Sequence, residues 1–300
     1  MVELRAMGTT VTIHAPTLSP DGEAAVAAAV AAEFEIAEAR FSRFRADSEL
    51  TELNRATAPI AVSPAMLNAL VRARAYVRLT AGRFDPTVGA AMIAAGYDQP
   101  FVAGALDRAT PAVAAARTRY AEVTIDPQRG VIARPAHVQL DLGGMIKGAT
   151  ADAAARHLPA TAALDAGGDA VLRGAGPEGD GWHVDVEDPA DPARTLVTLR
   201  VRDRAVATSA ANRRRWRRGD GWAHHLIDPA TGAPAATDLA QVTIVAATAE
   251  RAEVLAKAVF IAGRRAGRAL LETLPKTGAV LVDHRGDVEL VGPVEVAPDA

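Results

Sequence analysis

The start of the chain alternates apolar and polar residues, as a β-strand does, and the pattern continues through Val11–Ala15. A helical period follows it. Ser19 can cap a helix and proline suits the first helical position, so Ser19-Pro20 predicts a helix start. Apolar residues then recur at spacings of three and four, at Val26, Val30, Phe34, Ala37 and Phe41. This stripe predicts a long helix with one buried face.

Helix start signals recur twice more in the first third of the chain. Ser48 or Asp47 is expected to cap a short helix. Ser63-Pro64 opens a longer helix, which should end just before Gly82. The longer helix is expected to turn four apolar residues inward: Leu67, Leu70, Val71 and Val77.

The pattern changes to short strands from Ala121 onward. The segments AEVTID, GVIARP and HVQLDL are rich in β-forming residues and separated by turn residues, so they predict a meander. Further strands are expected at Ala162–Ala166, Trp182–Glu187, Thr195–Val201, Ala205–Ser209, Ala223–Ile227 and Gln241–Ala246, with a closing hairpin over Gly278–Val291. A helix is expected over Glu250–Ala262, ended by Gly263, and residues 98–119 are expected to form a loop with a short helix.

Helices and strands mix without strict alternation, which predicts an α+β (mixed α/β) fold with mostly antiparallel or mixed sheets and packed helices. Three hundred residues, 49% of them hydrophobic, suffice for a sizeable core. We expect a single domain over residues 1–300, or two joined lobes of about 1–120 and 121–300.

Composition narrows the classes of function. The chain has no cysteine, which excludes disulfides and a thiolate nucleophile. A net charge of -3 and a pI near 6.2 give no electrostatic case for nucleic acid or an anionic membrane. No apolar run approaches the roughly 20 residues of a membrane span, and the N-terminus lacks the apolar core of a signal peptide. We therefore expect a cytoplasmic protein without membrane insertion.

The basic run Arg213–Arg218, interrupted by Trp216, is a local exception to the acidic balance. Basic residues beside an aromatic ring can clamp phosphates and stack on bases. A short cluster in an acidic chain is more often a solvated hairpin tip, which we favour. A surface that docks an acidic protein partner is the remaining alternative.

The stretch Leu140–Asp152, LDLGGMIKGATAD, joins an apolar run to a helical pattern through two glycines. Such a turn lets a ligand approach the backbone, and the helix N-terminus offers N–H groups to an anion. Asp141 could accept a hydrogen bond from a ligand, or it could cap the helix that begins near Met145. A lysine near a helix N-terminus is unfavourable unless an anion is close, so Lys147 indicates an anion site or, alternatively, a solvated surface residue.

Eight segments of this sequence occur in the order and spacing of a known family. They are MGTTVTI, SRFRADSELTELN, GRFDPTVG, LDLGGMIKGATAD, LDAGGDAVLRG, VATSAANRR, HHLIDPATGAP and AERAEVLAKAVFIAG. From Met7 to Gly263 the chain thereby resembles the ApbE family, the FAD:protein FMN transferases. The resemblance implies an ApbE-like fold with a FAD site between lobes. It also implies transfer of FMN from FAD to a threonine hydroxyl of an acceptor flavoprotein, with release of AMP.

The resemblance also implies which residues contact FAD: Met7, Phe44, Arg83, Phe84, Asp85, Asp141 and Lys147. Phe44 would offer an aromatic face to a ring system, or it is a core residue. Asp85 precedes a proline, so a turn carboxylate that caps its own backbone is the alternative.

His225 is the expected general base, because histidine titrates near neutrality and can take a proton from an incoming threonine. The family's catalytic histidine directly precedes the I-D-P run, which selects His225 over His224. Strand alternation would place His225 and Ile227 on one face. Ile227 is also expected to contact FAD. The alternative is that both histidines are structural. Asp228 is expected to order its own D-P-A-T-G turn.

The expected metal site departs from the family pattern. In the family, Mg²⁺ is held by a backbone carbonyl at the position of Gly144 and by an aspartate and a threonine four residues apart. Those two positions are Glu253 and Lys257 here. Glutamate can bind Mg²⁺, but protonated lysine cannot. Either the two form an ordinary helical pair, or the lysine ammonium stands where the metal would, and metal binding is then weakened or lost.

A second departure is Ala210, which stands where the family usually has glycine and would impede a close ligand approach. FAD and an acceptor flavoprotein domain are thus the expected partners. Two other functions stay open at this point: a FAD pyrophosphatase that yields FMN and AMP, and a FAD-binding protein without catalysis.

Overall fold

The computed structural model describes residues 1–102, 105–111 and 113–298, and these fall into two compact units. The first unit comprises Met1–Glu35, Lys147–Ala210 and Thr237–Ala300. The second comprises Ile36–Ile146 and Ala211–Ala236. Each unit is therefore assembled from separate stretches of sequence. The number of domains stays a prediction.

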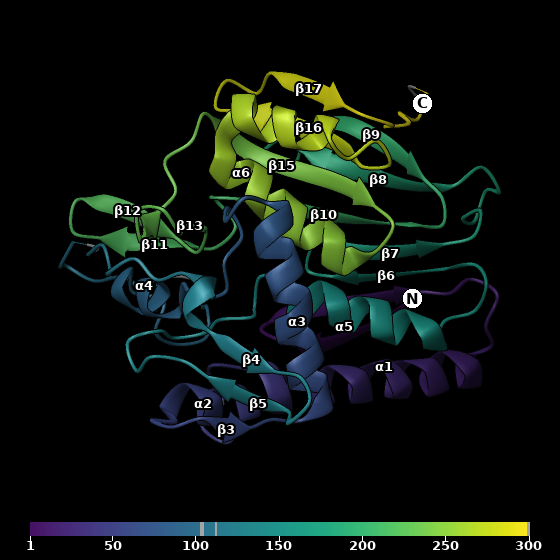
Figure 1. Cartoon of the computed structure of the whole chain (residues 1–300). Coiled ribbons are helices and arrows are strands. Elements are labelled where there is room, and N and C mark those ends of the chain that lie inside the picture. The colour runs from purple at the N-terminus through teal and green to yellow at the C-terminus, as the bar shows by residue number, and fades with distance from the viewer. Residues whose placement is uncertain (103–104, 112, 299–300) are drawn as a thin grey trace. The chain divides into compact units, whose positions relative to one another are not determined.

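The first unit is built on a sheet of eight strands in the order β1-β2-β6-β7-β10-β15-β16-β17, and every neighbouring pair is antiparallel (Figure 1). Its strands are β1 (Val2–Ala6), β2 (Thr9–His14), β6 (Ala162–Ala166), β7 (Asp169–Arg173), β10 (Arg204–Ala210), β15 (Leu239–Ala246), β16 (Gly278–Asp283) and β17 (Val288–Val291). The antiparallel pairing and the mixture of helix and sheet confirm the predicted α+β class.

Helices cover one face of this sheet and a hairpin covers the other. Adjacent residues of β10 point to opposite faces of the sheet. Ala205 packs with α1 (Pro20–Phe41) and α5 (Ile146–Ala154) on the helical face. Val206 belongs to the core under the hairpin of β8 (Trp182–Glu187) and β9 (Thr195–Val201). Helix α6 (Ala249–Glu272) packs against β10 and β15 (Figure 1). The last turn after α5 is a 3₁₀ helix, Ala155–His157.

The second unit holds shorter elements. Its helices are α2 (Glu49–Arg55), α3 (Pro64–Leu79), α4 (Gly89–Ala94) and a 3₁₀ turn, Tyr120–Glu122. Its strands form three small antiparallel sheets: β3 (Ile60–Ala61), β5 (Val131–Ala133) and β4 (Thr124–Asp126); β11 (Arg215–Arg218) and β12 (Gly221–His224); and β13 (Ile227–Asp228) and β14 (Ala233–Pro234).

The helix start signals are confirmed by their hydrogen bonds. The Ser48 hydroxyl accepts from the Thr51 N–H at 3.1 Å, and the Ser63 hydroxyl accepts from the Met66 N–H at 3.2 Å. The stripe of the first helix is also confirmed, because Val30 and Phe34 are fully buried. The predicted inward face of α3 is confirmed at Leu70, which is fully buried, is partly buried at Leu67 and Val77, and is wrong at Val71. Val71 is 44% exposed, and the buried positions are Met66, Ala69, Leu70 and Ala73.

Two predicted elements of the second unit are wrong. HVQLDL forms no strand, because its backbone groups bond to separate partners. The Asn54 side-chain amide donates to the Leu140 carbonyl and accepts from the Leu140 N–H, both at 2.8 Å, while the Asp141 N–H donates to the Pro86 carbonyl. Among the described residues of 98–119 there is no helix. Residues 103–104 and 112 of that segment lie outside the described part of the chain.

Gly263 ends the predicted helix as expected, but a second helical segment that was not predicted follows it directly within α6. Gly263 adopts a φ of 75°, which interrupts the helix, yet the chain resumes helical geometry to Glu272. The resumption has a cap from a distant segment, since the Asp238 carboxylate accepts from the Arg264 N–H at 2.9 Å. A helix start that depends on a residue 26 positions earlier has no local sequence signal.

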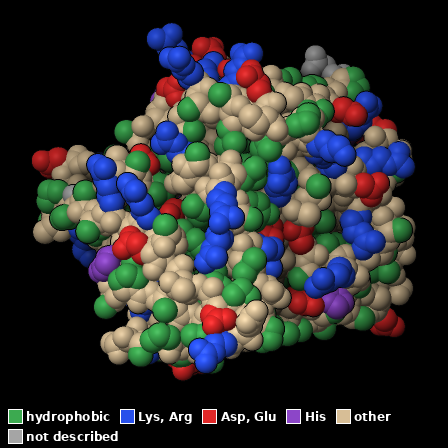
Figure 2. Space-filling model, in the orientation of Figure 1, with side chains coloured by type: hydrophobic (Ala, Val, Ile, Leu, Met, Phe, Trp, Pro, Cys, Tyr) green, Lys and Arg blue, Asp and Glu red, His purple; other side chains and the backbone are tan. Residues whose placement is uncertain are grey.

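The surface carries both signs of charge. On the face shown in Figure 2, lysine and arginine side chains alternate with acidic ones rather than forming one large patch of a single sign. Within the residues that the structure covers, no helix combines the length and the apolar character that a membrane crossing requires.

Candidate active site

A buried charge cluster of five side chains lies in the first unit. It consists of Lys147, Asp165, Asp169, Glu253 and Lys257. Lys147 donates to the Asp169 carboxylate and, at 3.0 Å, to the Ala166 carbonyl. Only 14% of the Lys147 side chain and 3% of the Asp169 side chain are exposed. The predicted alternative of a solvated surface lysine is therefore wrong.

The start of α5 packs closely on the start of α6, and this contact positions the cluster. A Cβ on Gly148 would lie 2.5 Å from the Ala249 carbonyl oxygen, so only glycine fits there. The Gly148 N–H donates to Glu253 at 2.9 Å. Asp152, one turn further along α5, accepts from the N–H groups of Ala249 and Glu250 at 2.8 and 3.0 Å. Two helix termini are thus fixed against each other by side chains.

Burial shifts the protonation of two carboxyl groups in the cluster. It raises the pKa of Glu253 to about 7, and the neighbouring negative charge of Asp169 adds to the rise. The two lysines act in the opposite direction. Burial also raises the pKa of Asp165, against the hydrogen bond that its carboxylate accepts from the Gly168 N–H. Carboxyl groups with shifted pKa values occur at functional sites and also in structural charge networks.

Met7 lies in the turn between β1 and β2, with a φ of 49° that non-glycine residues rarely adopt. This turn touches the glycine turn that follows β6. A Cβ on Gly167 would lie 1.9 Å from the Thr9 hydroxyl oxygen, so the close approach requires glycine. The segment that contains Met7 is therefore held beside the turn between Ala166, the last residue of β6, and Asp169, the first residue of β7.

An arginine–aromatic cluster lies in the second unit and centres on Arg43. Its guanidinium carbon lies 4.0 Å from the Phe44 ring centre and 4.7 Å from that of Tyr97. Its Nε donates to the Asp141 carboxylate at 2.7 Å. Tyr97 in turn stacks on Trp216, with ring centres 5.3 Å apart. Phe44 remains 37% exposed, so it is not the core residue considered as its alternative role.

Arg43 was not predicted from the sequence, although it connects two predicted FAD contacts, Phe44 and Asp141. The available signal was its place between Ser42 and Phe44 in an aromatic-poor chain. Asp141 does not cap α5. Its carboxylate accepts from the Gly143 N–H at 2.7 Å, which orders the glycine turn itself.

We expect Arg43 and Asp141 to be energetically coupled. A double-mutant cycle with Arg43→Met and Asp141→Asn should give a coupling energy of about 1.5–3 kcal/mol in urea unfolding, because the bond is charged and largely buried. The exposed pair Arg45–Asp47, with 35% and 75% of its side chains exposed, is the matched control and should give about 0–1 kcal/mol. Additive effects of the first two substitutions would contradict the coupling.

Two other predicted FAD contacts have structural partners. Phe84 is 3% exposed and meets the Tyr76 ring edge-on. Asp85 accepts from the N–H and hydroxyl of Thr87, at 2.9 and 2.7 Å, and from the Tyr120 N–H at 3.0 Å. Burial raises the pKa of Asp85, while those three hydrogen-bond donors lower it. Asp85 thus caps its own turn.

Arg83 is half-buried, and Ile227 is 4% exposed in a core shared with Trp216. The roles of Arg83 and Ile227 in FAD binding stay predictions.

The two adjacent histidines differ in what their ring nitrogens do. His224 uses both: Nε2 faces the Ala235 carbonyl at 3.1 Å and must donate, so Nδ1 accepts from the Leu226 N–H at 3.3 Å. His225 Nδ1 lies 3.4 Å from the Arg214 carbonyl. Since a carbonyl only accepts, the proton of neutral His225 belongs on Nδ1 and the basic lone pair on Nε2. This contact favours the tautomer that a general base needs at His225, whose catalytic role stays a prediction, while both ring nitrogens of His224 form backbone hydrogen bonds.

The predicted strand Ala223–Ile227 is interrupted, because β12 ends at His224 and β13 begins at Ile227. His225 lies in the bend between them, so strand alternation does not place it on the face of Ile227. The turn at Asp228 is confirmed: its carboxylate accepts from the Ala230 N–H at 2.9 Å and its carbonyl from the Gly232 N–H at 2.8 Å.

His224 should make stability depend on pH. Burial lowers its pKa from the ordinary 6.5, against the hydrogen bond to the Ala235 carbonyl, so the unfolded chain binds the proton more readily than the folded one. The contribution of His224 to the free energy of unfolding should therefore be complete above about pH 6.5 and decrease as the pH falls below that value. Urea unfolding at about pH 8 and about pH 5.5 should show a smaller loss for His224→Gln than for the wild type. An equal loss in both proteins would contradict this role.

Residues 7–281 match the profile of the ApbE family. The chain belongs to the ApbE family. A relative from Treponema pallidum, named FAD:protein FMN transferase, is 32% identical over 259 residues, which are 79% of this chain and 71% of the relative. A Vibrio cholerae protein of the same name is 28% identical over 243 residues, 78% of this chain and 72% of that protein.

Solved structures of ApbE proteins have the same fold. The ApbE protein of Thermotoga maritima superposes with a TM-score of 0.83 at 25% identity and covers 97% of this chain and 96% of its own. The flavin transferase ApbE of Vibrio cholerae superposes with a TM-score of 0.78 at 24% identity, over 99% of this chain and 96% of its own.

The residues at the ApbE metal position do not fit Mg²⁺ in this chain. One oxygen of Glu253 accepts from the Gly148 N–H, and the other lies 4.0 Å from the Lys257 ammonium. A protonated lysine has no lone pair for a metal and repels a cation. The third expected ligand, the Gly144 carbonyl, belongs to the other unit. Of the two expected side-chain ligands, Glu253 is already hydrogen-bonded within the chain and Lys257 is itself a cation.

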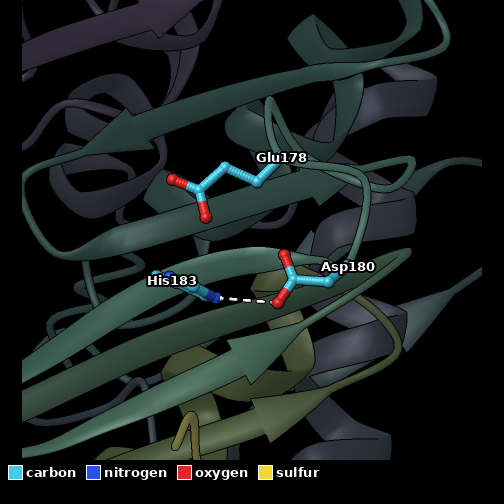
Figure 3. A group of neighbouring side chains, drawn as sticks. All are labelled: Glu178, Asp180 and His183. Atoms are coloured by element: carbon cyan, nitrogen blue, oxygen red, sulfur yellow. Dashed lines mark hydrogen bonds and ion pairs between the residues drawn. The ribbon is translucent and has the colours of Figure 1, made fainter. Parts of the chain in front are cut away.

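A second group of possible metal ligands lies away from these residues, where β7 connects to β8. The nearest ligand atoms of Glu178, Asp180 and His183 all lie within 4.8 Å of one another, and His183 Nε2 is 3.2 Å from the Asp180 carboxylate (Figure 3). All three side chains are exposed. Such exposed groups are common in proteins without a metal there, so we assign no ion to them.

Proposed function

We propose that this ApbE-family chain transfers FMN from FAD to a threonine hydroxyl of an acceptor flavoprotein and releases AMP. The match over residues 7–281 supports the reaction class, since relatives along most of the chain are named FAD:protein FMN transferases. The observation that carries the proposal is the pair of histidines. His224 forms two backbone hydrogen bonds, and the 3.4 Å contact between His225 Nδ1 and the Arg214 carbonyl supports the tautomer that a base requires.

The proposed step is one displacement at phosphorus. The threonine oxygen attacks the phosphorus of the FMN half of FAD, a new oxygen–phosphorus bond forms, and the bond to the AMP phosphate breaks. AMP leaves with the bonding electrons, and the threonine proton passes to His225 Nε2. A base that removes this proton while the bond forms typically contributes about 10²–10⁴-fold to the rate.

The residues that contact FAD are proposed from the resemblance to the ApbE family, each considered within its own unit. They are Met7, Phe44, Arg83, Phe84, Asp85, Asp141, Lys147 and Ile227. The exposed Phe44 ring, braced by Arg43, suits a flat ring system, and the Lys147 ammonium suits a phosphate. No step is assigned to Mg²⁺. A cytoplasmic location stays a prediction.

One incubation tests the proposal against its alternatives. Purified protein is mixed with FAD, with and without a flavoprotein domain that accepts FMN from a related transferase, and AMP is measured by chromatography. AMP that appears only with the acceptor supports the transferase. AMP without acceptor would indicate a FAD pyrophosphatase instead, and a yellow protein with intact FAD would indicate a binding protein.

A further inference from the structure

Lysine is rare in this chain and concentrated in the buried charge cluster. Of the 33 lysines and arginines, three are lysines: Lys147, Lys257 and Lys276. Two of these three lie in the cluster, where the exposed fractions of their side chains are 14% and 17%. An ammonium group is a compact point charge, whereas a guanidinium spreads its charge over a plane. The cluster therefore contains the residue type that most resembles a small cation.

Each of two buried carboxylates in the cluster has its own lysine. Asp169 is bonded to Lys147, and Glu253 has Lys257 one helical turn further along α6, with 4.0 Å between the Lys257 ammonium and the nearer carboxylate oxygen. The negative charge of these two carboxylates is thus partly offset inside the chain, with Asp165 as the third carboxyl group of the cluster. A divalent cation could enter only against the charge of Lys257.

We propose that the Lys257 ammonium takes the place of a divalent cation in this chain and pairs with the diphosphate of FAD without Mg²⁺. The inference rests on the proposed function, because it takes FAD as the ligand. A fixed positive charge in a mostly buried position stabilises phosphate oxygens more strongly than a solvated one. The Glu253 carboxylate, bonded to the Gly148 N–H, then orients the lysine rather than a metal.

Titration of the wild-type protein gives the first test. Calorimetry with Mg²⁺ should show no stoichiometric binding, either to the free protein or to the protein with FAD. The dissociation constant of FAD, followed by flavin fluorescence, should be the same in EDTA and in millimolar Mg²⁺. Tight one-to-one Mg²⁺ binding, or FAD binding that tightens tenfold or more with Mg²⁺, would overturn the inference.

Variants give the second test. Lys257→Met should weaken FAD binding by about tenfold or more, because one charged partner of the diphosphate is lost. Lys276→Met, at an exposed lysine outside the cluster, is the matched control and should bind FAD as the wild type does. Lys257→Thr should bind FAD weakly in EDTA and more tightly with Mg²⁺, since a hydroxyl can ligate the ion. Circular dichroism checks that each variant is folded.

The outcomes separate this inference from the proposed function. If FAD binds and is used only with Mg²⁺, the inference fails and the transferase assignment stands. If Lys257→Met binds FAD as tightly as the wild type, the lysine is not the diphosphate partner and the inference fails as well. If the wild type binds no FAD under either condition, both the inference and the proposed function are wrong.

Discussion

Replacing His225 with alanine should lower the rate of FMN transfer by about 10²–10⁴-fold. The reason is its tautomer. The Arg214 carbonyl, 3.4 Å from Nδ1, favours a proton on Nδ1, and in the proposed step Nε2 takes the proton of the threonine hydroxyl. Affinity for FAD should stay nearly unchanged, because the histidine acts on the acceptor. Single-turnover transfer, with AMP release as the readout, measures the rate, and flavin fluorescence measures the affinity.

The neighbouring His224 provides the control for this experiment. Its two ring nitrogens are used by Ala235 and Leu226, so His224→Gln should transfer FMN at close to the wild-type rate at neutral pH. If His225→Ala keeps the full rate, or if His224→Gln loses as much, the assignment of the base is wrong. The pair is informative because both substitutions remove an imidazole from adjacent positions.

Lys147→Met should destabilise the protein by about 3–5 kcal/mol. The substitution leaves the Asp169 carboxylate, whose side chain is 3% exposed, without its charged partner in the core. Urea unfolding without FAD is the appropriate measurement, since a bound ligand would add its own stabilisation. The midpoint should shift to a markedly lower urea concentration while the m-value stays constant.

A second substitution at Asp169 tests the cause of this loss. Lys147→Met combined with Asp169→Asn should recover a large part of the lost stability, because no unpaired charge remains buried. Lys276→Met should change stability little, as an exposed residue does. An Lys147→Met midpoint equal to that of the wild type would show that the pair contributes nothing.

The sequence predicted those elements whose signals are local. Ser48 and Ser63 cap their helices as expected, because a cap acts over three residues. Strands β8 and β9 have the predicted bounds, since alternation and flanking turn residues suffice for a hairpin. The same holds for the Asp228 turn.

The failures have long-range causes. The helix resumes after Gly263 because Asp238 caps it, and the expected strand at residues 137–142 is replaced by bonds to separate partners such as Asn54. Neither partner is near in sequence. Alternation also failed at His225, where the strand is interrupted. In each case a tertiary contact overrides a local preference.

Most residues of the candidate site were predicted from the family resemblance, and not from local patterns in the sequence. The resemblance to the ApbE family supplied the residues, and the departure at Lys257 was visible as a charge in place of a hydroxyl. What it could not supply was the surroundings of these residues. Burial of Glu253, the Asp169 partner of Lys147 and the stack of Arg43 on Phe44 all depend on residues brought together by folding.

The intact mass of the acceptor after incubation with this protein and FAD tests the central claim most directly. We predict that the acceptor gains the mass of FMN less one water, in step with AMP release. An acceptor whose target threonine is replaced by valine should gain nothing. Free FMN and AMP that accumulate while the acceptor keeps its original mass would contradict the claim.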